Sequence, residues 1–171
     1  MFIFCSIFIS CLFSNFHQRC PEIDVRLDRP ELDANYISPS GHFSIHYDLS
    51  GSNAPSQIDS NDNGIPDYVE SAAIAADSVK YVLNDLMNFI EVSDDEDGIY
   101  DIYILNLYST LYGSCHSEGN GISYIKIRNN YNTLLSNLCS DSTDMLWMLI
   151  AHEYFHAIQY KYKGHSNDSY F

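Results

Sequence analysis

His152, Glu153 and His156 form an H-E-x-x-H pattern, in which two histidines lie four residues apart and a glutamate follows the first. On a helix, side chains four apart share one face, so both imidazoles can bind one Zn²⁺ through neutral ring nitrogens. The Glu153 carboxylate would lie beside that face, where it can take a proton from water and pass it to a leaving amine. The pattern predicts a hydrolytic zinc site with His152 and His156 as ligands and Glu153 as general base.

The residues around the motif predict the helix that this chemistry needs. No glycine or proline interrupts residues 144–163, and Gly164 follows as a helix stop. Two surface histidines on an ordinary helix would match the same motif. The long apolar run before the motif favours a buried active-site helix instead.

A catalytic zinc site needs a third protein ligand. His165 and Asp168 follow the motif, and each also fits an ordinary loop position. The extended pattern with a glycine and a third histidine is excluded, because Gln159 and Tyr162 occupy those two positions. We expect the third ligand to be a glutamate on a following helix, outside this sequence.

A second set of oxygen-bearing residues matches the EF-hand calcium loop. The predicted Ca²⁺ ligands are Asp59, Asn61, Asn63, the Ile65 carbonyl, Asp67 and Glu70, with Gly64 at the sharp turn. An asparagine–glycine turn leading into a helix would explain the middle of this stretch, but not its outer carboxylates. The sequence therefore predicts a structural calcium ion. The acidic loop at residues 94–98 lacks the final carboxylate of this pattern, so we interpret it as a solvated turn.

Hydrophobic periodicity predicts the elements that position these sites. Period-two alternation and β-branched residues indicate strands at residues 43–47, 100–107 and 123–127, and helical spacing indicates a helix at 67–90. Strands followed by a long helix and then the motif helix indicate an α+β fold, a small mixed sheet packed on both helices. We expect the strand at 123–127 to border the substrate cleft and to pair with an extended peptide.

The N-terminal region suggests export. Residues 2–13 form an apolar run too short to span a bilayer, so we interpret residues 1–19 as a signal peptide and short spacer. Prolines punctuate residues 20–41, which predicts an extended lead-in, and residues 42–171 form the N-terminal part of the expected catalytic domain. In a secreted or cell-surface protein, Cys115 and Cys139 could form a disulfide, although reduced thiols also fit.

The charge balance limits the possible partners. A formal net charge of −15, from 23 acidic and 8 basic residues, argues against nucleic acid or an anionic membrane surface. With 46% hydrophobic residues the chain can bury one core. We expect a peptide or protein substrate and no membrane span.

Several motifs in order along residues 28–171 resemble a family of large secreted bacterial zinc metalloproteases of gluzincin or zincin-like type, some of which end in a type IX secretion sorting domain. The resemblance is carried by residues 29–31, 40–48, 59–70, 100–104 and 152–160. It implies a zincin-like fold, peptidase activity at His152, Glu153 and His156, and a glutamate third ligand. A non-catalytic, calcium-stabilised surface or adhesion module is the alternative.

Overall fold

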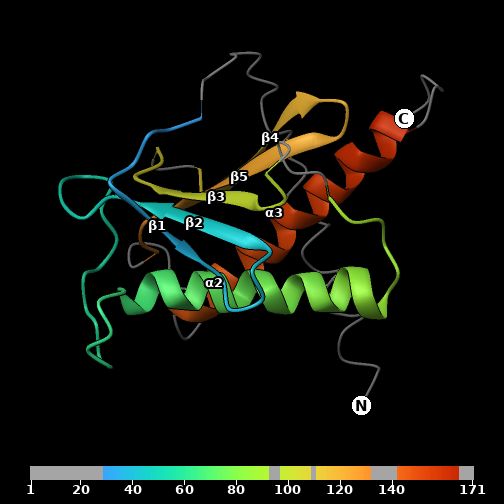
Figure 1. The fold of residues 1–171 in the computed structure, drawn as a ribbon. Coiled ribbons are helices and arrows are strands. Elements are labelled where there is room, and N and C mark those ends of the chain that lie inside the picture. Colours follow the sequence, from blue (N-terminus) through green and yellow to red (C-terminus); the bar gives the residue numbers. More distant parts are fainter. Residues whose placement is uncertain (1–28, 93–96, 109–110, 132–141, 166–171) are drawn as a thin grey trace.

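The computed structural model describes residues 29–92, 97–108, 111–131 and 142–165. These residues form a five-stranded mixed sheet with two long helices on one of its faces (Figure 1). The predicted α+β class is therefore confirmed at the level of the sheet and its two helices.

The strands lie in the order β1 (Ala34–Ile37), β2 (Phe43–Tyr47), β3 (Tyr100–Leu105), β5 (Ile122–Arg128) and β4 (Gly113–Gly119). The three central strands are parallel, and each edge strand is antiparallel to its neighbour. Alternate side chains of the central strands face the helices and are fully buried, among them Ile45, Ile102 and Ile125. Burial of this apolar face holds the two layers together.

Helix α2 (Asp67–Lys80) packs on β1 and β2, α3 (Ser142–His165) packs on β4 and β5, and the helices contact each other. Helix α2 begins where the sequence predicts, directly after Pro66, and buries four alanines that allow a close approach. It ends earlier than predicted. The chain continues as a π-helix, η1 (Tyr81–Leu86), and Asn88 then adopts a positive φ of 57°.

The π-helix places Asn84 in the protein interior, where both the nitrogen and the oxygen of its side-chain amide form hydrogen bonds. Its amide nitrogen donates to the carbonyls of Phe89 (3.2 Å) and Ile90 (2.9 Å). Its amide oxygen accepts a 2.8 Å hydrogen bond from the hydroxyl of Tyr154, in the middle of α3. This side chain ties the end of the first helix to the second.

Two parts of the sheet differ from the sequence-based expectations. β1 lies within the stretch predicted as an extended lead-in. A strand can form there because the prolines at 30 and 39 lie outside it and remove no hydrogen bond from its pairing with β2. The prediction that residues 123–127 pair with an extended peptide substrate is wrong. These residues belong to β5, which is paired on both sides, and β4 is the edge strand on that side of the described sheet.

The turn between β4 and β5 lies directly on α3. Gly119, Asn120 and Gly121 all have positive φ, which suits a tight hairpin. A Cβ atom added at Gly121 would lie 2.9 Å from Cδ and 3.2 Å from Cα of Lys161. The glycine therefore lets the hairpin tip approach the helix backbone closely.

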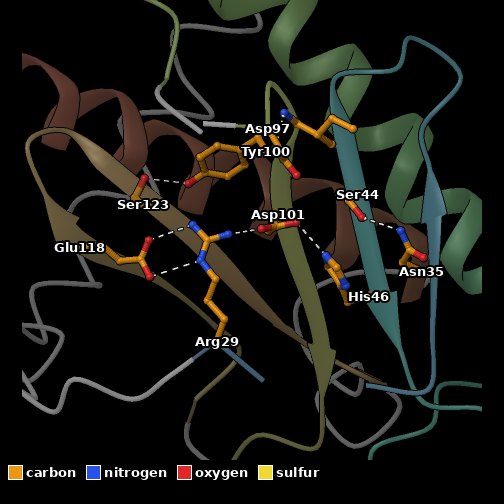
Figure 2. Close-up of polar contacts among 10 residues, drawn as sticks. Arg29, Asn35, Ser44, His46, Asp97, Tyr100, Asp101, Glu118 and Ser123 are labelled. Carbon is orange, nitrogen blue, oxygen red and sulfur yellow. Dashed lines mark hydrogen bonds and ion pairs between the residues drawn. The ribbon is translucent and has the colours of Figure 1, made fainter. Parts of the chain in front are cut away.

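The opposite face of the sheet carries an ion-pair network (Figure 2). The guanidinium of Arg29 pairs with Asp101 on β3 and makes two hydrogen bonds to Glu118 on β4, at 2.8 and 3.2 Å. The other oxygen of Asp101 lies 2.7 Å from Nε2 of His46 on β2. Arg29 thus connects the lead-in to two strands separated by β5.

Among the described residues, no helix has the length and apolarity that a membrane crossing requires.

Candidate active site

Helix α3 contains His152, Glu153 and His156. The helix buries a stripe of side chains toward the sheet and α2: Leu146, Ile150, Tyr154, Ala157 and Ile158. This spacing is that of one helix face. It leaves His152 exposed and His156 half-buried, while Glu153 points toward the sheet.

The two imidazoles converge. Nε2 of His152 and Nε2 of His156 lie 3.1 Å apart, with the ring planes at 89°. Two nitrogens that each lie about 2.0–2.1 Å from one tetrahedral zinc ion are separated by about 3.3 Å. The spacing and the solvent access of the pair therefore fit two ligands of one ion.

The ring of His156 is oriented from its other side. Its Nδ1 lies 2.9 Å from Oε1 of Gln159, one turn further along α3. Because an amide oxygen only accepts, Nδ1–H must donate, and the lone pair is left on Nε2. Partial desolvation of the His152 ring by its neighbours, with a smaller effect of the nearby His156, lowers the pKa of His152. The lowered pKa favours the neutral His152 ring, the form that binds a metal ion.

Glu153 lies between α3 and the edge strand β4. Only 3% of its surface is exposed, and its Oε2 has no hydrogen-bond partner among the described residues. Burial raises its pKa to about 7, and a hydrogen bond from the backbone N–H of Cys115 opposes this shift. A buried carboxylate oxygen without a partner is costly in a native structure, so it is a candidate for contact with water, ion or substrate.

Gly113 on β4 creates the space for this carboxylate. A Cβ atom at Gly113 would lie 3.0 Å from both Cγ and Oε1 of Glu153. Any larger residue would push the Glu153 side chain or the strand.

No third ligand is placed by the structure. Across residues 29–92, 97–108, 111–131 and 142–165, no group of three or more His, Cys, Asp or Glu side chains is arranged to hold a metal ion. Asp168 and the side chain of His165 lie outside the described positions. The third ligand stays a prediction.

Hydrogen bonds connect some of the predicted calcium ligands at residues 59–70. Asp59 accepts hydrogen bonds from the backbone N–H groups of Asn63 (3.2 Å) and Gly64 (2.7 Å). Glu70 accepts from the side-chain amides of Asn61 (3.1 Å) and Asn63 (2.7 Å). Four predicted ligand side chains therefore share one loop, and Gly64 makes the turn with φ 87°.

Of the remaining two predicted ligands, Asp67 has other hydrogen-bond partners, and the Ile65 carbonyl stays a prediction. Asp67 accepts hydrogen bonds from the backbone N–H (2.9 Å) and hydroxyl (2.6 Å) of Ser60, which lower its pKa. Ile65 donates its backbone N–H to Asn63 Oδ1 at 2.8 Å. An ion would have to exchange several of these hydrogen bonds for coordination by the same oxygens.

Other sequence-based predictions are only partly covered. Cys139 lies outside the described residues, so the pairing with Cys115 stays a prediction. Residues 94–96 of the second acidic loop lie outside the described residues. At its end, Asp97 accepts a hydrogen bond from the backbone N–H of Ile99 at 2.8 Å, and Gly98 has a φ of 84°. This geometry is that of a turn at residues 97–99, and for the rest of the loop the turn stays a prediction.

Sequence reasoning did not identify Gly113, the backbone of Cys115 or the role of Gln159. The first two belong to β4, a strand too polar to be recognised from β-propensity. The Asn120–Gly121 pair before the next strand is the signal that could have revealed the hairpin. Gln159 lies three residues after the second histidine, where a helix places side chains in contact.

Comparisons with known proteins add no relative: the chain matches no family model, no curated protein and no solved structure.

Proposed function

We propose that this chain contains the active-site helix of a secreted zinc metallopeptidase with a zincin-like fold. The observation that carries the proposal is the 3.1 Å separation of the two Nε2 atoms of His152 and His156. A buried, partly unsatisfied carboxylate follows directly in the sequence, at Glu153. Together these side chains provide two metal ligands and a proton-transfer group.

The proposed mechanism assigns each residue one task. When bound, zinc would act as a Lewis acid toward the scissile carbonyl and toward water. Glu153 takes the proton from the attacking water and delivers it to the leaving amine nitrogen. The raised pKa of its carboxyl, about 7, suits a group that must both accept and release a proton near neutral pH.

The edge strand β4 is the proposed site of substrate pairing, in place of β5. β4 lies beside Glu153 and, within the described part of the sheet, pairs only with β5. An extended peptide could add to its outer edge through main-chain hydrogen bonds. The scissile bond would then pass close to the carboxylate. A glutamate on a following helix is proposed as the third ligand.

Calcium is proposed as a structural ion at residues 59–70. The loop connects the segment after β2 with the first turn of α2, because Glu70 lies within that helix. Binding of an ion to the folded state alone would stabilise this connection by mass action.

The decisive experiment compares the wild type with Glu153→Gln in a preparation that includes any coding sequence following Phe171. We expect both proteins to bind equal amounts of zinc. We also expect casein turnover in the variant to fall by a factor of about 10² to 10⁴. Glu31→Gln, which removes an exposed carboxylate in the lead-in, is the matched control and should keep full activity.

Two results would reject the peptidase. One is absence of zinc from the wild type, and the other is turnover that survives in Glu153→Gln. A protein that responds to calcium but neither binds zinc nor cleaves peptides would support the second candidate, a calcium-stabilised surface or adhesion module. The clustering of Asp59, Asn61, Asn63 and Glu70 is the observation that favours that candidate.

A further inference from the structure

We infer that Gln159 is a positioning residue for a metal ligand: it fixes the tautomer of His156 and thereby sets the affinity of the histidine pair for a divalent cation. The inference deepens the proposed function and rests on it. It depends on the position of one proton, which the hydrogen bonds around the two rings determine.

The first step is the proton on His156. Gln159 Oε1 lies 2.9 Å from Nδ1 of His156 and can only accept. His156 is therefore held with its proton on Nδ1, and its Nε2 lone pair points toward His152. This is the tautomer that an Nε2 ligand requires, and the group on the far side of the ring fixes it.

The second step is the asymmetry between the two rings. The 3.1 Å contact between the Nε2 atoms needs one proton, and His156 has none at Nε2. His152 must therefore donate its own Nε2–H to His156. A cation entering between the rings replaces that single proton, and only His152 has to change tautomer. Without Gln159, both rings would sample both tautomers.

The third step is that, within the described part of the chain, His156 is the side-chain hydrogen-bond partner of Gln159. The Gln159 side chain is exposed on α3, so its replacement leaves the buried face of the helix intact. Replacement of Gln159 should therefore change the tautomer of His156 and not the free energy of unfolding.

The test uses Gln159→Leu, which removes the acceptor, and Gln159→Glu, which retains one. Histidine ring nitrogens are observed by long-range ¹H–¹⁵N correlation in the metal-free protein, and the His156 signals are assigned by their loss in His156→Gln. We expect the Nδ1–H form of His156 in the wild type and in Gln159→Glu. Gln159→Leu should show a mixture with the Nε2–H form.

Zinc affinity is measured on the same preparations by competition with a chromogenic chelator. We expect it to fall by about 10- to 100-fold in Gln159→Leu, as for other partners of metal-binding histidines. Gln159→Asn keeps the amide but shortens the side chain by one methylene, so it should behave like the leucine variant. Gln57→Leu makes the same exchange at an exposed position outside α3 and should keep wild-type affinity.

The outcomes separate the inference from the proposed function. An unchanged His156 tautomer in Gln159→Leu, or unchanged zinc affinity, overturns the role of Gln159 while leaving a zinc-binding wild type intact. A wild type without measurable zinc affinity overturns the proposed function, and with it the link from tautomer to metal.

Discussion

The buried carboxylate of Glu153 is positioned by an edge strand that lies far from it in the sequence. The backbone N–H of Cys115 donates a hydrogen bond to the carboxylate, and Gly113, which lacks a Cβ atom, leaves space for it. A glycine that leaves room for a side chain is as specific a requirement as a hydrogen bond, because a single methyl group removes the space. The motif therefore depends on β4 as much as on its own helix.

We predict that Gly113→Ala reduces peptide turnover by a factor of about 10 to 100 while zinc content stays at the wild-type level. The added methyl would lie 3.0 Å from Cγ and Oε1 of Glu153, so the carboxylate must move away from its proton-transfer position. Turnover and bound zinc are measured on the same preparation. Ser117→Ala, an exposed position on the same strand, should leave both unchanged. Full activity in Gly113→Ala would contradict the assigned position of Glu153.

At the scale of elements, the π-helix η1 decides how α3 is held. Asn84 is buried and bonds three groups at once, one of which is the hydroxyl of Tyr154 inside the H-E-x-x-H motif. π-helical turns are rare and frequently lie near functional sites. Here the turn brings an amide to the middle of the motif helix.

We predict that Asn84→Ala lowers the free energy of unfolding by about 2–4 kcal/mol, because it leaves a buried hydroxyl and two carbonyls without their partner. Urea denaturation followed by tryptophan fluorescence measures the change at Trp147, which lies on α3. Asp85→Ala, the neighbouring position, is exposed and should cost well under half as much. Equal losses in both variants would show that Asn84 has no special role.

The sequence predicts those elements whose side chains carry a clear period. Residues 144–163 were predicted as the motif helix, and α3 spans Ser142–His165. β2, β3 and β5 were also expected, because their apolar residues alternate. The sequence does not predict β4, because Ser114, His116 and Ser117 give no apolar pattern. The order of the strands in the sheet cannot be predicted from the residues of any single strand. The histidine pair followed from local spacing, whereas Gly113 required the tertiary contact.

At the scale of the whole molecule, one histidine makes stability depend on pH. Burial, and then the charge of Lys126, lowers the pKa of His116 to about 4. The unfolded chain takes up this proton near pH 6.5, whereas the folded protein resists it. The free energy of unfolding therefore falls as the pH drops from about 6.5 to 4.

We predict that His116→Phe reduces this acid-induced loss of stability by about 1 kcal/mol, a value discounted for solvent screening of a half-buried ring. Phenylalanine keeps the stacking on Tyr124, where the ring centroids lie 5.1 Å apart, but cannot titrate. The measurement is the unfolding free energy at pH 7 and pH 4.5. Parallel pH profiles for the two proteins would contradict the prediction.

Calcium should also act on the molecule as a whole. At a concentration one hundred times its Kd, an ion bound only to the folded state adds about 2.7 kcal/mol. We therefore predict that chelation lowers the melting temperature by about 5–10 °C. Glu70→Gln should show little response to calcium, whereas Asp97→Asn, outside the loop, should respond like the wild type. A wild-type melting temperature that does not change on chelation would contradict the calcium proposal.

The ion pairs of Arg29 with Asp101 and Glu118 limit how much of the N-terminus can be removed. Asp101 and Glu118 come from strands on either side of β5, and both pair with the single guanidinium of Arg29. A recombinant version beginning after residue 29, or digestion by a protease past that point, would remove the cation that both carboxylates share and leave Asp101 with its contact to His46. Expression studies and crystallisation trials should accordingly keep Arg29 in every shortened form.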